Sequence, residues 1–94
     1  MTEADAIFIA KMAYGQRGFC RRTGDKNAGG EWTRITGYQV GYYRRGKAPR
    51  RNLLSTVHGN GATPHEAIDA ALARTSGTPT GAKLYAAVLL SAPH

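Results

Sequence analysis

Basic and aromatic side chains crowd the segment from residue 43 to residue 51. Five of these nine residues are Lys or Arg, and the Gly-Lys-Ala-Pro run among them predicts a basic hairpin loop over residues 46–51. Guanidinium groups pair with phosphates and aromatic rings stack on nucleobases, but Tyr and Arg are also enriched in protein-binding hot spots. If the neighbouring strands pair, bases outside the segment join it. We therefore predict a binding site of Arg21, Arg22, Arg34, Tyr43, Arg44, Arg45, Lys47, Arg50 and Arg51.

The placement of charge supports a site for an anionic partner. The chain has a net charge of +7, but residues 11–51 carry +9, residues 1–10 carry −2 and residues 52–94 are neutral. Nine of the thirteen bases are Arg, whose planar fork suits phosphate and carboxylate groups. Such a field favours nucleic acid or an acidic protein surface, and charge alone does not separate the two.

The remaining reactive side chains predict neither an active site nor a metal site. The spacing of His58, His65, His94 and Cys20 matches no zinc motif. The arginines that follow Cys20 can lower the pKa of its thiol, but no partner base is marked, so a half-buried structural thiol is the preferred interpretation. The Gly-Asn-Gly of residues 59–61 lacks the third glycine of a dinucleotide-binding loop. We expect a protein that is not an enzyme and has no cofactor and no metal.

Length and composition indicate one small globular domain over residues 1–94. No apolar run approaches the roughly 20 residues of a membrane span, so no membrane partner is expected. The first residues are acidic where an export signal is basic, and the single cysteine favours a reducing compartment. These features predict a cytoplasmic protein. They leave its oligomeric state open between monomer and homodimer.

The first half of the chain predicts a helix and two strands. A helix over residues 2–14 is capped by Thr2 and ends at Gly15, although its Ile-Phe-Ile run also suits a strand. A short strand over 17–23 precedes a flexible glycine-rich loop over 24–30. The next strand starts at Trp32 and has a bulge near residues 36–37. Its alternation places Tyr38, Val40 and Tyr42 on one face and Gln39, Gly41, Tyr43 and Arg45 on the other.

The second half predicts a returning strand over residues 52–58, a turn over 59–61 and a strongly marked helix. Thr63 caps this helix, Pro64 takes its first position and Glu66 completes a capping box. Its buried stripe consists of Ala67, Ile68, Ala71 and Leu72, and it ends near residues 76–77. After a loop over 78–81, the apolar segment 82–91 suits a helix slightly better than a strand.

Together these elements predict an α+β fold of order α-β-β-β-α plus a C-terminal helix or strand. About three antiparallel strands form a small sheet, and the helices pack on one of its faces. The other face is left to solvent or to a partner. The alternative to a binding site is a solvated basic hairpin above a core that contains Trp32, Tyr38 and Tyr42.

The strand-strand-helix arrangement over residues 37–73 resembles double-stranded-RNA-binding domains in its order and in its alanine-rich second helix. That family clamps phosphates with lysines at the start of this helix, where the present chain has Pro64, His65 and Glu66. Its RNA-binding residues are therefore not carried over. The run Gly61-Ala-Thr-Pro-His-Glu-Ala-Ile68 is also similar to a helix start in HicB-type antitoxins, but their DNA-binding tail is absent.

In its size and its strand-strand-helix ending, the chain also resembles small phage and mobile-element proteins, CRISPR inhibitors (anti-CRISPR proteins) among them. This resemblance implies a non-catalytic inhibitor that docks on a nucleoprotein complex. We expect first a phage-type inhibitor that binds a protein component of a nucleic-acid-handling complex through the basic hairpin. The second expectation is a domain that binds DNA or RNA directly through the same hairpin. A third is an oligomer that pairs exposed strand edges.

Overall fold

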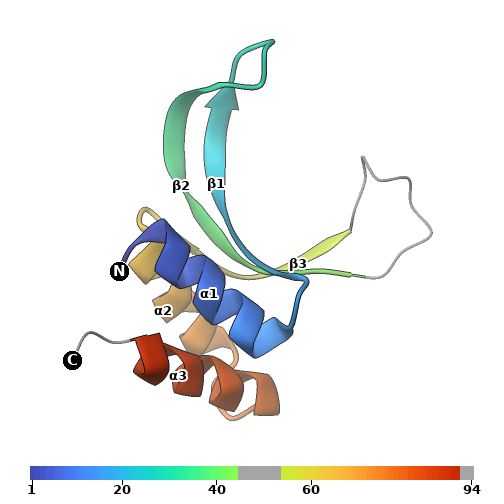
Figure 1. The fold of residues 1–94 in the computed structure, drawn as a ribbon, viewed down its shortest axis with the longest axis vertical. Coiled ribbons are helices and arrows are strands. Elements are labelled where there is room, and N and C mark those ends of the chain that lie inside the picture. The colour runs from blue at the N-terminus through green and yellow to red at the C-terminus, as the bar shows by residue number, and fades with distance from the viewer. Residues whose placement is uncertain (45–53, 92–94) are drawn as a thin grey trace.

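The computed structural model describes residues 1–44 and 54–91. Within these ranges three helices and three strands follow one another in the order α-β-β-β-α-α, which confirms the predicted α+β class (Figure 1). The strands form one antiparallel sheet of order β1-β2-β3. The elements are α1 (Glu3–Tyr14), β1 (Gly18–Lys26), β2 (Trp32–Tyr43), β3 (Ser55–Gly61), α2 (Pro64–Arg74) and α3 (Pro79–Ser91).

Helix α1 forms where its capping residues predict it. The Thr2 hydroxyl accepts a hydrogen bond from the Asp5 amide, and the Asp5 carboxylate accepts one from the Thr2 amide, at 3.1 and 2.9 Å. The helix ends at Gly15, whose φ of 85° suits glycine and whose N–H donates to the Lys11 carbonyl oxygen. The Ile-Phe-Ile run lies within this helix, where Ile9 is fully buried.

Strand β1 is longer than the sequence predicts. Its pairing with β2 continues to Lys26, so residues 24–26 of the expected loop are strand. The side chain of Asn27 accounts for the difference, because its Oδ1 accepts the amides of Gly29 and Glu31 at 3.0 Å each and closes a short turn. The predicted bulge is confirmed, since Thr23 pairs with Gly37 and the next register position skips residue 36.

Strand β3 lies further along the chain than expected. It extends from Ser55 to Gly61, so residues 59–61 are strand and not a turn; residues 52–53 of the predicted strand lie outside the described residues. The reason is a close approach of α2 to the sheet. A Cβ atom on Gly59 would come within 3.0 Å of the Ala67 carbonyl oxygen and the Ala71 amide nitrogen, so the glycine lets the two backbones touch.

Helix α2 begins at Pro64, after the Thr63 hydroxyl accepts the Glu66 amide at 3.1 Å, as predicted. The expected capping box is wrong in one bond: the Glu66 carboxylate accepts the Ala62 amide at 2.9 Å and not the Thr63 amide. The helix ends at Arg74, before the predicted end near residues 76–77, because the amide of Thr75 makes the last helical hydrogen bond, to the Ala71 carbonyl oxygen.

The last segment is a helix, as the sequence slightly favours. Helix α3 already begins at Pro79, so most of the predicted 78–81 loop is its first turn. The Thr78 hydroxyl makes this start possible, because it accepts the Gly81 amide at 3.0 Å. None of the described helices has the length and apolar character needed to cross a membrane.

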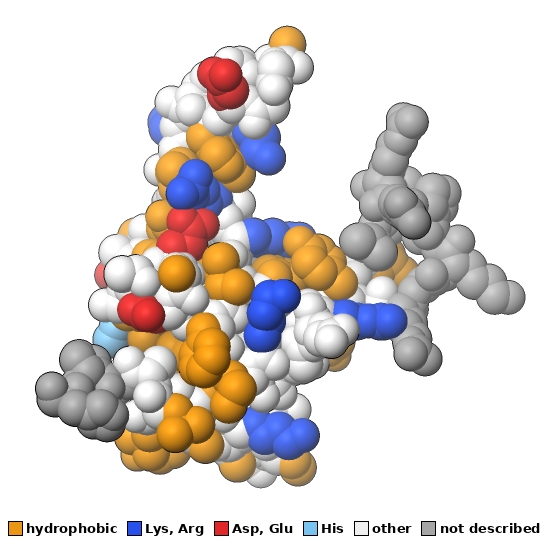
Figure 2. All heavy atoms as spheres, in the orientation of Figure 1, with side chains coloured by type: hydrophobic (Ala, Val, Ile, Leu, Met, Phe, Trp, Pro, Cys, Tyr) orange, Lys and Arg blue, Asp and Glu red, His pale blue; other side chains and the backbone are white. Residues whose placement is uncertain are grey.

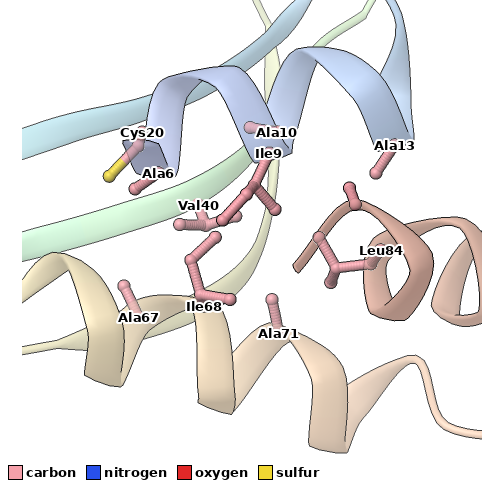
Figure 3. Close-up of a cluster of buried hydrophobic side chains, with 11 residues drawn as sticks. Ala6, Ile9, Ala10, Ala13, Cys20, Val40, Ala67, Ile68, Ala71 and Leu84 are labelled. Carbon is pink, nitrogen blue, oxygen red and sulfur yellow. The ribbon is translucent and has the colours of Figure 1, made fainter. Parts of the chain in front are cut away.

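The core lies between one face of the sheet and the helices (Figure 3). Helices α1 and α2 pack on this face, and α3 packs against both helices. Small side chains let the elements approach closely around a few large ones. The largest fully buried side chains are Ile9, Ile68, Leu84 and Val40.

Cys20 is part of this core, with 5% of its surface exposed. Burial, followed by the negative charge of Glu3, raises the pKa of the thiol to about 11. The arginines that follow Cys20 therefore do not lower this pKa. At neutral pH the side chain is a protonated thiol that packs as a small hydrophobic group, in line with the structural interpretation of Cys20.

Candidate binding site

Strand pairing sorts the side chains of β1 and β2 onto two faces. Cys20 and Val40 are paired and both point into the core, so Phe19, Arg21 and Gln39 point to the opposite face. Tyr43 lies on the same open face, as the predicted alternation of side chains along β2 requires. The open face therefore contains two of the predicted site residues, Arg21 and Tyr43.

Arg21 is the centre of a cluster that joins all three strands. Its guanidinium carbon lies 4.4 Å from the ring centroid of Phe19 and 5.9 Å from that of Tyr43. Its Nε donates to Gln39 Oε1 at 3.0 Å, and its Nη2 donates to Ser55 Oγ at 3.2 Å. These contacts hold a long and otherwise flexible cation in one place. We call Phe19, Arg21, Gln39, Tyr43 and Ser55 the Arg21 cluster.

The aromatic rings of this cluster are largely covered. The ring centroids of Phe19 and Tyr43 are 4.6 Å apart. Only 6% of the surface of Phe19 is exposed, although its side chain points away from the helices. Arg21 lies over both rings, so an aromatic base finds no exposed Phe19 face to stack on. The other four members, Arg21, Gln39, Tyr43 and Ser55, are half-buried.

An open hollow of about 430 Å³ adjoins the cluster. Residues from both faces of β1 line it, and they include three predicted site residues, Arg21, Arg22 and Tyr43. Lys26 and Trp32 add a further base and ring, with the Lys26 ammonium 4.4 Å from the indole centroid. Figure 2 shows Lys and Arg side chains along the strands, while hydrophobic side chains gather over α1 and α3. The remaining lining residues are Glu3 and Cys20.

Arg22 points toward the helices and meets an acid there. Its Nε and Nη2 donate to one carboxylate oxygen of Glu3 at 3.1 and 2.9 Å. These hydrogen bonds, and then the charge of Glu3, raise the pKa of Arg22 above its already high ordinary value. Glu3 thus balances the charge of Arg22, whereas Arg21 in the same hollow bonds only to neutral groups among the described residues.

The structure does not bring every predicted residue to the hollow. Arg34 lies near the far end of the β1–β2 hairpin, where its Nε is 3.6 Å from Asp25 and both side chains are exposed. Arg44 is exposed just beyond β2, and its amide donates to the Leu54 carbonyl oxygen. The remaining predicted bases, and the whole 46–51 loop, lie outside the described residues: Arg45, Lys47, Arg50 and Arg51.

Sequence reasoning missed part of the site. Phe19 and Gln39 could have been found by extending the alternation of β2 to β1, because both then share the face of Arg21. Ser55 carries no local signal, since only the register between β2 and β3 places it beside Arg21. The alternative interpretation of a solvated basic hairpin places Trp32 in the core. In the structure, Trp32 is half-buried and lines the hollow.

No protein-family model matches this chain, and no curated protein or solved structure matches it either. The site is therefore interpreted from its own geometry. In residues 1–44 and 54–91, no three His, Cys, Asp or Glu side chains gather as metal ligands would.

A second polar cluster lies on the helix side of the sheet and joins α1 to β2 and β3. The Tyr14 hydroxyl is 2.9 Å from Nδ1 of His58, and the Tyr42 ring centroid lies 5.4 Å from that of Tyr14 and 5.7 Å from that of His58. Burial, followed by the charge of Arg74 on α2, lowers the pKa of His58. Burial, followed by Tyr42, raises the pKa of Tyr14 to about 12. We therefore assign the Tyr14 O–H as donor to a neutral imidazole.

This cluster makes stability depend on pH. Because the pKa of His58 is lower in the folded protein than its ordinary value of 6.5, the unfolded chain binds the proton more readily. The free energy of unfolding should therefore fall as the pH drops below about 6.5. Urea unfolding between about pH 5 and pH 8 measures this slope.

Two substitutions check the assignment. His58→Gln should flatten the slope, because it removes the imidazole whose pKa is lowered in the folded protein. Tyr14→Phe should cost about 1 kcal/mol at neutral pH, since it removes the hydrogen bond to His58. Equal slopes in the wild-type and His58→Gln proteins would show that His58 does not carry the effect.

Proposed function

We propose that this protein is a non-enzymatic binding protein that holds an acidic segment of a protein partner against the Arg21 cluster and the adjoining hollow. The observation that carries this proposal is the fixed guanidinium of Arg21, which two rings and two hydrogen bonds position before any partner arrives. A cation that is already ordered loses little conformational entropy on binding. Its Nη1 has no hydrogen-bond partner among the described residues, so one edge of the guanidinium faces an incoming carboxylate.

A protein partner fits this geometry better than single-stranded nucleic acid. Stacking of bases needs an exposed ring face, and Phe19 offers only 6% of its surface. A carboxylate needs only a guanidinium N–H, and Arg21 Nη1 donates to no described residue. Direct binding of DNA or RNA is the second candidate, because Lys26 and Trp32 pair a cation with a half-exposed ring in the same hollow.

The biological context that we propose is the one implied by the resemblance to small phage proteins. In that context the partner is a protein component of a nucleic-acid-handling complex, and the chain acts as an anti-CRISPR-type inhibitor by occupying its surface. The net charge of +7 restricts the contact to an acidic region of that component, because the basic surface that receives nucleic acid would repel this chain.

Titration against labelled single- and double-stranded DNA and RNA at two salt concentrations separates the two candidates. We expect only non-specific affinities of about 10⁻⁶ to 10⁻⁴ M, with a steep loss at higher salt and little effect of Arg21→Ala. Tight binding that Arg21→Ala weakens at least tenfold would instead support direct nucleic-acid recognition.

Capture from nuclease-treated cells that contain nucleic-acid-handling complexes then tests the protein partner. A specific partner should be retained by the wild-type protein and by Arg34→Ala, which removes the same charge at the far end of the hairpin. It should be lost with Arg21→Ala. If the two variants retain the partner equally, the Arg21 cluster is not the contact.

A further inference from the structure

We propose that this protein forms a symmetric homodimer in which α1 and α3 of one copy pack antiparallel on the same helices of a second copy. The observation that carries this inference is a second apolar stripe on α3, on the side that faces away from the core. The inference goes beyond the proposed function and does not depend on it.

Helix α3 is apolar on two sides. Its inner stripe packs against α1 and α2 and contains the buried residues Gly81, Leu84 and Ala87. Its outer stripe consists of the exposed residues Ala82, Tyr85, Ala86, Leu89 and Leu90. This spacing of i, i+3, i+4, i+7 and i+8 is typical of a helix face that packs on a core, and Lys83 is the only charged residue of the helix. Because an outer helix normally turns polar side chains to water, the outer stripe indicates a second packing surface.

Helix α1 extends this surface. Phe8 and Met12, one turn apart, are 50% and 49% exposed, although the inner side of the same helix is buried in the core. Helices α1 and α3 pack against each other, and Figure 2 shows hydrophobic side chains over both helices on one face of the molecule. We call Phe8 and Met12, together with the outer stripe of α3, the outer helix surface.

The outer helix surface has the area that a small dimer interface needs. Its five large side chains are each 49% to 66% exposed. A large side chain has about 150–250 Å² of surface, so the five together expose about 500 Å². The smallest specific interfaces bury about 600 Å² on each partner, which the neighbouring exposed alanines supply. We therefore expect a reversible dimer of modest affinity.

The sizes of the side chains on α3 favour a second copy in antiparallel orientation. The outer stripe is small at its start, at Ala82, and large at its end, at Leu89 and Leu90. Antiparallel pairing about Ala86 sets the leucine end of one helix over the alanine end of the other, so large side chains fill the space above small ones. A parallel pair would instead crowd the leucines together and leave a gap between the alanines.

Helix α1 has the same gradient. Its exposed side chain is small near the start, at Ala4, and large near the end, at Met12, with Phe8 between them. Antiparallel pairing about Phe8 therefore sets the Met12 end of one copy over the Ala4 end of the other. It also sets the first turn, which contains Asp5, over the last turn, which contains Lys11, so that the ends brought together have opposite charges.

One two-fold axis satisfies both helices. They run antiparallel within the chain, because α1 begins and α3 ends at the same side of the molecule (Figure 1). Ala13 of α1 and Thr80 of α3 line one pocket and so lie level with each other. Phe8 and Tyr85 lie level as well, since each is five residues from that pair. The centres of both helix pairings thus fall on one axis, as a closed two-fold contact requires.

Charge also favours this face for contact between copies. The net charge of +7 makes two copies repel, but Figure 2 shows Lys and Arg side chains along the strands, and the outer helix surface itself contains no charged residue. Helices that lie on membranes have a polar face rich in Lys and Arg, which α3 lacks. The Arg21 cluster lies on the opposite face of the sheet, so pairing through the helices leaves it free.

Sedimentation over about 1–500 µM protein tests for the dimer, because interfaces of this size are often weak. We expect the mass to rise from that of one chain to that of two across this range. Ala86→Glu sets two carboxylates together at the axis and should weaken the dimer at least about tenfold. Ala28→Glu makes the same charge change in the exposed turn between β1 and β2, so it is the matched control and should dimerise like the wild-type protein. Circular dichroism checks that both variants are folded.

Crosslinking through introduced cysteines tests the orientation. A short bis-maleimide should link Ala86→Cys into a dimer but not Ala28→Cys, and the buried, protonated Cys20 does not compete. In an equal mixture of Ala82→Cys and Leu90→Cys, we expect mainly the mixed dimer. Parallel helices would instead link each variant mainly to itself.

The other outcomes would overturn the inference. A protein that stays monomeric throughout the concentration range does not pair through its helices. A dimer that the two Glu variants weaken equally uses another surface, and mainly like-to-like crosslinks contradict the antiparallel arrangement. Binding of a monomeric wild-type protein to phosphatidylglycerol vesicles, lost in Ala86→Glu, would assign the outer helix surface to a membrane. None of these experiments involves Arg21, so the proposed function stands or fails separately.

Discussion

Gly59→Ala should destabilise this protein by about 3 kcal/mol, the upper part of the range for overpacked interiors. The added methyl group would come within 3.0 Å of two backbone atoms of α2, at Ala67 and Ala71, so no side-chain rotation can relieve the clash. Helix α2 would have to move away from β3 and disturb the core that both share. For a domain of this size, a drop in melting temperature of about 12–24 °C is expected.

Gly29→Ala is the matched control for this substitution. Gly29 lies in the turn between β1 and β2, where a Cβ atom would meet only Asn27 Oδ1 at 3.4 Å. We expect its melting temperature to stay within a few degrees of that of the wild-type protein, because surface substitutions usually change stability by about 0.5 kcal/mol or less. If both variants melt together, the close contact between α2 and β3 does not limit stability.

Ile68→Ala should cost about 2–5 kcal/mol of unfolding free energy. Ile68 is 1% exposed and packs in the core between the helices and the sheet (Figure 3). Several of its neighbours in this core are alanines, whose short side chains cannot fill the cavity that the substitution leaves. Because a domain of this size is stable by only about 5–15 kcal/mol, a substantial fraction of the protein would be unfolded at moderate urea concentrations.

The same change at an exposed site isolates the effect of burial. Ile35 is 44% exposed on the projecting β1–β2 hairpin, so Ile35→Ala should shift the urea midpoint far less than Ile68→Ala. Similar losses at the two positions would mean that the hairpin is as tightly packed as the core, contrary to the structure. Both midpoints can be measured by tryptophan fluorescence, since the chain has a single tryptophan.

The starts of α1 and α2 were predictable because their signals are local. Thr2 with Asp5, and Thr63 with Glu66, lie within three residues of the amides that they cap, so adjacent sequence contains most of the interaction. The alternation of β2 was predictable for the same reason. One error occurred where a distant element decided the structure. Residues 59–61 look like a turn by composition, but as strand they let α2 contact the sheet backbone.

The candidate site, too, was predictable only in part from the sequence. The amino-acid sequence alone determined the α+β class, the excess of positive charge and the shared face of Tyr43 and Gln39. Only the tertiary structure decided that Arg21 joins the open face while its neighbour Arg22 turns toward Glu3, and that Ser55 completes the cluster. The physical reason is that register between strands depends on contacts between residues far apart in the chain, and a shift of one position moves every side chain to the opposite face.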